Sequence, residues 1–106
     1  MTVNTYRDLR VWQKAMELVV ASYEQTKQFP PSELYGVVSQ IHRAAVSIPA
    51  NIPEGHGRED LGDYRHHLSI VNGSLMELET HFLFAGQLGY LKAEPINRPG
   101  TLTPDT

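Results

Sequence analysis

The sequence predicts an all-α protein folded as an antiparallel, up-down helical bundle. Three stretches of the 106-residue chain carry apolar side chains at alternating steps of three and four, the spacing of one face of an α-helix. Turns rich in proline and glycine separate these stretches, and short turns make neighbouring helices antiparallel. No stretch alternates apolar and polar residues as a strand does, so we expect no sheet.

The first helix is expected over residues 8–26. Asp8 is its expected N-cap, and Pro30-Pro31 ends it because two prolines cannot continue a helix. Its apolar side chains form two adjoining stripes, so this helix should have neighbours on more than one side. One stripe holds Leu9, Trp12, Met16, Val19 and Tyr23, and the other holds Val11, Ala15, Leu18 and Ser22.

The second helix is expected over residues 33–55, with Ser32 as its N-cap. Pro49 and Pro53 lie inside this stretch, and each removes a backbone donor at a cost of about 3 kcal/mol in a helix interior. We therefore expect a kink or early fraying between Ser47 and Pro53. The apolar stripe of this helix comprises Leu34, Val37, Ile41, Ala44 or Ala45, Ile48 and Ile52.

The third helix is expected over residues 61–89 and has the most regular pattern. Asp60 and Asp63 form a capping-box-like pair at its start, and Gly89 is its expected C′ residue. Residues 1–92 then form one helical domain, whereas 93–106 carry three prolines without periodicity and should be extended or disordered. The heptad seam consists of Leu61, Tyr64, Leu68, Val71, Leu75, Leu78, Phe82 and Ala85.

Composition narrows the possible functions. Lys and Arg number 9 against 12 Asp and Glu, a net charge of -3, so the chain lacks the basic excess typical of phosphate-contacting proteins. Without cysteine it has no disulfide, thiolate zinc site or cysteine nucleophile. No stretch approaches the ~18 apolar residues of a membrane span, and the N-terminus lacks an apolar run. We expect a cytoplasmic protein without a membrane segment.

Neither a metal site nor a catalytic site is expected. Asp63 and His66 are three residues apart, and Glu77 and His81 are four apart. A di-iron bundle needs two Glu-x-x-His motifs, and this chain has none. The serines lie in helical patterns without a nucleophile-elbow context. We therefore expect no metal, no cofactor and no enzymatic activity, with a metal or small-ligand site at His66, His67, His81 and nearby acids as the alternative.

Two polar clusters stand out on the second and third helices. The first comprises Arg43, Asn51, Glu54 and Arg58, and the second comprises Asn72, Gly73, Ser74, Glu77 and Glu79. Glycine costs about 1 kcal/mol against alanine inside a helix, so Gly73 suggests close approach to Ala44 or Ala45. Arg43 or Arg58 would then pair with a glutamate of the second cluster. We favour such a polar latch between helices, with a ligand site as the alternative.

A basic stripe is expected on the first helix. Arg7, Arg10 and Lys14 follow steps of three and four, which place them on one side. We favour a solvated face balanced by Glu17, with a surface for RNA or another partner as the alternative.

Several motifs resemble those of the 23S rRNA-intervening-sequence proteins, also called four helix bundle proteins. The resemblance covers about residues 6–91, and its most specific segments are Arg43-Ala-Ala-Val-Ser-Ile-Pro-Ala-Asn51, Glu54-Gly55 and Gly73-Ser-Leu-Met-Glu-Leu-Glu79. It implies a left-handed up-down bundle that forms a ring, a homopentamer, with no enzymatic activity and a role mostly unassigned. A related branch serves diversity-generating retroelements as an accessory protein, beside a reverse transcriptase and nucleic acid.

Two functions are compatible with this resemblance. The first is a non-enzymatic homo-oligomer that binds ribosomal RNA or a nucleoprotein partner through the basic stripe. The second is a protein-interaction scaffold without nucleic-acid contact, which the acidic balance favours.

The sequence departs from the family pattern in two places. Pro53 replaces a small, helix-compatible residue, and the stretch after Leu91 turns proline-rich where the family has its fourth helix. Either the fourth helix is missing, or the tail fills its groove in extended form. The apolar surface left over also favours self-association.

Overall fold

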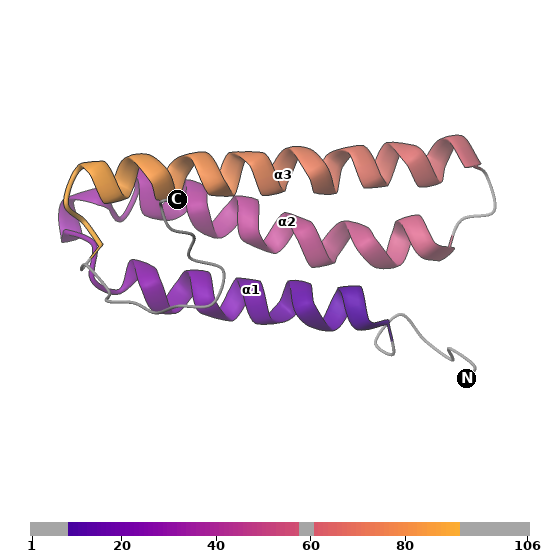
Figure 1. Ribbon diagram of the computed structural model, residues 1–106, viewed down its shortest axis with the longest axis horizontal. Helices are drawn as coiled ribbons and strands as arrows, with labels where there is room; N and C mark the ends of the chain where they lie inside the picture. The colour runs from indigo at the N-terminus through magenta and orange to yellow at the C-terminus, as the bar shows by residue number, and fades with distance from the viewer. Residues whose placement is uncertain (1–8, 58–60, 92–106) are drawn as a thin grey trace, which may run out of the picture.

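The described residues form an all-α bundle of three long helices. The computed structural model describes residues 9–57 and 61–91, without the side chains of 53–57, 61 and 63. The helices are α1 (Arg10–Thr26), α2 (Val37–Gly57) and α3 (Leu61–Gln87), with a short 3-10 turn, Pro31–Glu33, before α2. Consecutive helices run antiparallel, with α2 between the other two (Figure 1). The described residues contain no strand, so the predicted fold class is confirmed.

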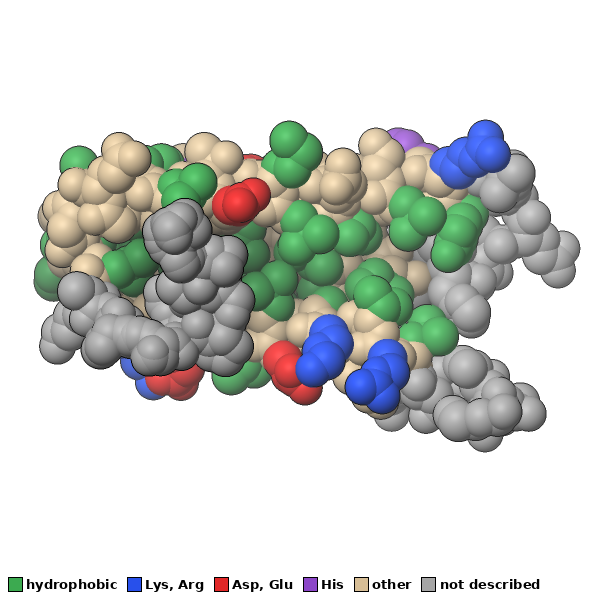
Figure 2. Space-filling model, viewed as in Figure 1, with side chains coloured by type: hydrophobic (Ala, Val, Ile, Leu, Met, Phe, Trp, Pro, Cys, Tyr) green, Lys and Arg blue, Asp and Glu red, His purple; other side chains and the backbone are tan. Residues whose placement is uncertain are grey.

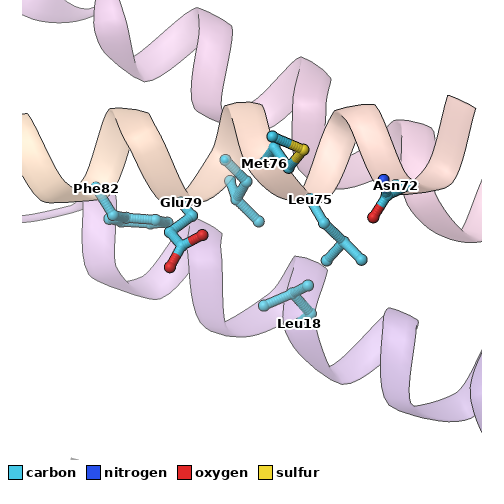
Figure 3. Close-up of a pocket in the computed structure, with 7 residues that line it drawn as sticks. Leu18, Asn72, Leu75, Met76, Glu79 and Phe82 are labelled. Atoms are coloured by element: carbon cyan, nitrogen blue, oxygen red, sulfur yellow. The ribbon is translucent and has the colours of Figure 1, made fainter.

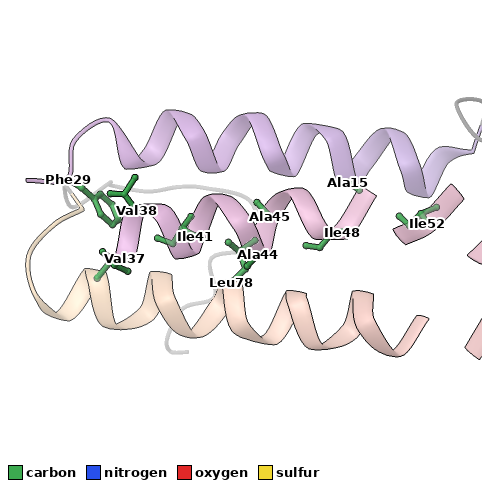
Figure 4. Packing of buried hydrophobic residues seen from close by; sticks show 11 residues of the cluster. Ala15, Phe29, Val37, Val38, Ile41, Ala44, Ala45, Ile48, Ile52 and Leu78 are labelled. Atoms are coloured by element: carbon green, nitrogen blue, oxygen red, sulfur yellow. The ribbon is translucent and has the colours of Figure 1, made fainter. Parts of the chain in front are cut away.

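The middle helix, α2, supplies most of the core. Figure 4 shows Val38 and Ala45 on the side of α2 turned to α1, and Val37 and Ala44 on the side turned to α3. No Cα atom of α1 lies within 8 Å of one in α3, so α2 alone joins the bundle. Of the eleven hydrophobic side chains that are buried in the described part of the chain, seven belong to α2: Val37, Val38, Ile41, Ala44, Ala45, Ile48 and Ile52.

The start of α2 differs from the sequence prediction. The helix begins at Val37 rather than residue 33, and the Glu33 carboxylate accepts a hydrogen bond of 3.4 Å from the Val37 backbone N–H. This bond satisfies a donor that would otherwise be unpaired in the first turn. Leu34, expected in the buried stripe, therefore lies in the preceding turn and is 53% exposed.

The end of α2 also differs. The helix continues through Pro49 and Pro53 to Gly57, so the expected early fraying is wrong. Pro49 and Ile52 are both buried, and this packing stabilises the helix despite the missing backbone donors. The Asn51 side-chain amide adds a hydrogen bond of 2.7 Å to the Ser47 carbonyl.

The C-terminus of α3 confirms the role predicted for Gly89. Its φ of +81° places it in the left-handed region, and its N–H donates to the Gly86 carbonyl at 3.1 Å. The Tyr90 N–H donates to the Ala85 carbonyl at 3.0 Å, which completes a Schellman motif. The expected caps Asp8, Asp60 and Asp63 lie outside the residues or side chains that the structure describes.

Helix α3 is rotated relative to its predicted seam. Its line of contact with α2 runs through His67, Ser74, Leu78 and Ala85, all buried. Leu68 and Leu75, expected inside, remain 45% and 41% exposed. Apolar periodicity alone could not show this rotation, because α2 covers only one flank of the seam.

Helix α1 is packed on one side only among the described elements. Its buried line, Ala15, Ser22 and Thr26, includes two members of the second predicted stripe and faces α2. Val11 and Leu18 lie on one flank of this line, and Met16, Val20 and Tyr23 lie on the other. Each apolar stripe is therefore only half covered.

Two glycine substitutions in α3 should have opposite effects on stability. A Cβ at position 73 would meet nothing within 4 Å, so Gly73→Ala should stabilise the fold by about 0.5–1 kcal/mol. Gly89→Ala also has open space but forces a side chain into positive φ, and should destabilise by about 1 kcal/mol. Urea unfolding measures the free energy of unfolding of both variants. A loss of stability in Gly73→Ala would contradict the open space around this position.

Candidate functional site

A polar network joins α2 to α3 inside the bundle. The Ser74 hydroxyl donates to the Ser47 hydroxyl at 2.9 Å. The Asn51 amide donates to the Ser47 carbonyl at 2.7 Å and to its hydroxyl at 3.3 Å, and Asn51 Oδ1 lies 3.1 Å from His67 Nδ1. An amide oxygen only accepts, so His67 Nδ1 carries the proton of this bond.

Helical spacing brings these four side chains together. Ser47 and Asn51 are four residues apart on α2, and His67 and Ser74 are seven apart on α3, so each pair shares one face. His67 and Ser74 are buried, and hydrogen bonds to buried groups are costly to leave unmade. The network sets the axial alignment of α2 against α3, because a shift of either helix would break several bonds at once.

Only part of the predicted polar latch is brought together. Asn51 and Ser74 belong to the network, whereas Arg43 and Glu79 are exposed and form no ion pair with a described residue. Glu77 lies 3.5 Å from His81 on its own helix. Glu54 and Arg58 lie outside the described side chains.

The expected close approach at Gly73 is wrong. Gly73 is exposed, and a Cβ there would meet nothing within 4 Å. Its neighbour Ser74 makes the contact with α2 instead. The sequence analysis did not connect Ser47 and His67 with this network. Their spacing could have indicated it, because Ser47 is four residues from Asn51 and His67 is seven from Ser74, which places each pair on one face of its helix.

An apolar groove separates α1 from α3. A hollow of about 430 Å³ lies between Leu18 of α1 and the α3 residues Leu75, Leu78 and Phe82, with Asn72 and Glu79 on its rim (Figure 3). The space-filling view shows hydrophobic side chains gathered between the two helices (Figure 2). A second hollow continues the groove, and Val11, Ala15, Leu18, Ile48, Ile52, Val71 and Leu75 are among its lining residues.

The described part of the basic stripe borders this groove. Arg10 and Lys14 are both exposed, and Lys14 lines the second hollow. Lys14 lies 3.7 Å from Glu17, with both side chains 70% exposed, and such a pair contributes little to stability in water. Arg7 lies outside the described residues. Figure 2 shows Lys and Arg side chains over the N-terminal half of α1.

A second polar contact, between α1 and α2, involves His42. Its ring stacks on Tyr23 with centroids 3.6 Å apart, and its Nε2 lies 2.8 Å from the Thr26 hydroxyl. The Thr26 hydroxyl donates to the Tyr23 carbonyl at 3.0 Å, so it accepts from His42. Burial lowers the pKa of His42, because a charged imidazole loses hydration there.

None of these clusters has the composition of a metal centre. Within residues 9–57 and 61–91, apart from the side chains not described, no three His, Asp or Glu side chains gather closely enough to hold an ion. None of the described helices is long and apolar enough to span a membrane.

A comparison with protein families shows to which family the chain is related. The model of the 23S rRNA-intervening sequence protein family matches residues 7–101, which include all three helices. The chain belongs to this family. No curated protein matches it. As a 23S rRNA-intervening sequence protein, it belongs to a family of largely unknown function that is not known to be enzymatic.

In this 23S rRNA-intervening sequence protein, the two network serines should be energetically coupled. Ser74→Ala leaves Ser47 without its cross-helix partner and should destabilise the fold by about 1–2 kcal/mol. Ser47→Ala/Ser74→Ala removes both hydroxyls and should cost less than the sum of the single changes. A double-mutant cycle by urea unfolding measures the coupling, and strict additivity would contradict a shared network.

Stability should also depend on pH through His42. Because its pKa is lowered in the folded state, the unfolded chain binds a proton more readily, so stability is full above about pH 6.5 and falls below it. Melting temperatures between pH 7 and pH 5 measure this. The melting temperature of His42→Gln should fall less over this pH range. The matched variant His66→Gln, altered at an exposed histidine, should lose as much melting temperature as the wild type.

Proposed function

We propose that this family member is a non-enzymatic homo-oligomer that binds ribosomal RNA through the basic stripe of α1. The observation that carries the proposal is the exposure of Arg10 and Lys14. Counted by helical angle, Arg10 lies on the side of α1 turned away from its buried line, and Lys14 lies on the flank beside the groove. Both side chains are exposed, so a phosphate backbone has access to them.

One copy of the stripe would bind weakly. The chain as a whole carries a net charge of -3, and Lys14 is partly balanced by Glu17. A closed oligomer repeats the stripe around its axis, and several weak contacts on one RNA raise the overall affinity by avidity. Self-association is therefore part of the proposed mechanism of binding.

The far flank of α1 supports self-association. Met16, Val20 and Tyr23 follow steps of four and three, and all three are exposed in the single chain. This stripe lies on the opposite flank from the groove, so a neighbouring copy seated there would leave Arg10 and Lys14 free. The family resemblance favours five copies in a ring.

RNA binding should fall with salt and with loss of the stripe. A fluorescent 23S ribosomal RNA fragment is titrated with the full chain at two salt concentrations. Arg10→Gln/Lys14→Gln should weaken binding and make the salt slope shallower, by about one for each phosphate that a copy no longer neutralises. Arg43→Gln, which removes an exposed cation of α2, is the matched control and should bind as the wild type.

Two results would contradict RNA binding through α1. One is the absence of binding even at low salt, where electrostatic attraction is strongest. The other is an equal loss of affinity in Arg43→Gln, which would show a dependence on overall charge.

The solution mass should be a multiple of the 11.9 kDa chain mass, and we expect five copies. Light scattering on the purified protein measures it. Val20→Glu places a charge in the Met16–Val20–Tyr23 stripe and should lower the mass while helical content is retained. A single-chain mass for the wild type at micromolar concentration would contradict self-association.

A protein-interaction scaffold without nucleic-acid contact is the second candidate. The acidic balance of the chain and the apolar groove between α1 and α3 favour it. Nuclease treatment separates the two functions: complexes that survive complete RNA digestion support the scaffold, and complexes that dissociate support RNA binding.

A further inference from the structure

The groove between α1 and α3 combines cations with an apolar cavity near the start of α1. Lys14 lines the second hollow, which has a volume of about 200 Å³, and Arg10 lies four residues before Lys14 on the same helix. The other side chains that line this hollow are apolar: Val11, Ala15, Leu18, Ile48, Ile52, Val71 and Leu75. Farther along the groove, the rim carries Glu79. The two parts of the groove therefore differ in charge.

Helix α3 adds a cation and an aromatic ring beside the second hollow. Tyr64 lies seven residues before Val71, which lines this hollow, so Tyr64 is on the face of α3 that borders the groove. Arg65 lies seven residues before Asn72, which is on the rim, and Arg65 is exposed. Figure 2 shows cationic side chains over the first half of α1 and at the N-terminal end of α3, with hydrophobic side chains between them.

We infer that this part of the groove binds single-stranded RNA, with one base inserted into the second hollow and a nearby base stacked on Tyr64. Arg10 and Lys14 contact phosphates from one rim, and Arg65 contacts them from the other. The inference rests on the RNA binding proposed above and defines the class of RNA. It adds two residues of α3 to the cations of α1.

An apolar hollow beside cations distinguishes single strands from duplexes. In a duplex the bases are paired and stacked, so the cations reach phosphates while the hollow stays empty. An unpaired base can turn out of its strand and enter the hollow while its phosphate stays near Lys14. The cations alone would bind both forms of RNA, and the buried base adds affinity for the single strand.

The position of Tyr64 suits the stacking of a second base. Its side chain is 37% exposed, so one part of the ring packs on the protein while another part is open to a ligand. Tyr64 and Val71 are separated by about 10 Å along the helix axis. A strand with stacked bases covers this distance in about three nucleotides, at about 3.4 Å each, and a strand with splayed bases in fewer. Both bases can therefore belong to one short segment.

Two acidic side chains define the path of the strand. Glu79 lies about 21 Å from Arg65 along α3 and would repel phosphates on that part of the rim. Glu17 lies 3.7 Å from Lys14, but both side chains are 70% exposed, so a phosphate can replace Glu17 at little cost. The strand therefore crosses the groove near Arg10 and Arg65 instead of following its whole length.

A comparison of single-stranded and duplex RNA tests the inference on the full chain. A fluorescent RNA of about 12 nucleotides without self-complementarity, and the blunt duplex of the same sequence, are titrated at the same salt concentration. The single strand should bind at least about fivefold more tightly, the effect of one stacked base. A strand with abasic sites keeps its phosphates and should lose this advantage.

Substitutions on α3 separate stacking from charge. Tyr64→Ala should weaken single-strand binding about fivefold or more, with an unchanged salt slope, because it removes a ring and no charge. Tyr64→Phe keeps the ring and should bind as the wild type. Arg65→Gln should make the salt slope shallower, by about 0.7 for each phosphate released from a single strand. The matched control is Tyr35→Ala, which removes a tyrosine that is 92% exposed in the turn before α2 and should leave binding unchanged.

Two outcomes would overturn the inference and leave RNA binding through α1 intact. One is equal affinity for the single strand and the duplex. The other is an unchanged affinity of Tyr64→Ala for the single strand. The absence of binding to either RNA would instead contradict the proposed function, and the inference with it. Circular dichroism confirms that each variant keeps its helical content.

Discussion

Burial of α2 on two sides is the constraint on which the bundle depends. Ile41 is completely buried, and the small side chains Ala44 and Ala45 allow α3 and α1 to approach from different sides. Because the backbones of α1 and α3 stay apart, every close approach between the described helices involves α2. The outer helices therefore keep apolar flanks that α2 cannot reach, and these flanks form the groove.

The polar network adds alignment to this packing. Apolar contacts between α2 and α3 would tolerate small shifts along the axis, since one alanine or leucine can replace another. Ser47, Asn51, His67 and Ser74 do not tolerate them, because each buried polar atom needs its own partner. The network thus contributes specificity, whereas the buried hydrophobic side chains contribute most of the free energy of folding.

The local features of the fold could be predicted from the sequence. Helical periodicity indicated the three helices, Pro30-Pro31 ended α1, and Gly89 ended α3, because each effect acts within a few residues. The start of α2 could not be predicted, since it depends on the Glu33 carboxylate folding back to Val37. Its continuation through Pro49 could not either, because it depends on burial against other helices.

The site was less predictable than the fold. Asn51 and Ser74 were selected as members of two polar clusters, but their partners Ser47 and His67 can be identified only when the rotation of α3 is known. Arg43, one of the two arginines expected to pair with a glutamate of α3, is exposed. To predict which side chains pair between two helices, the rotation of both helices about their axes must be known. The periodicity of one helix does not give that rotation.

Native-state hydrogen exchange tests the central position of α2 most directly. If α2 holds the bundle together, amides from Ile41 to Ile48 should exchange only through global unfolding, with the highest protection in the chain. Amides in the first half of α1, packed on one side, should exchange through smaller openings at lower free energy. Equal or weaker protection in α2 than in α1 would contradict the account.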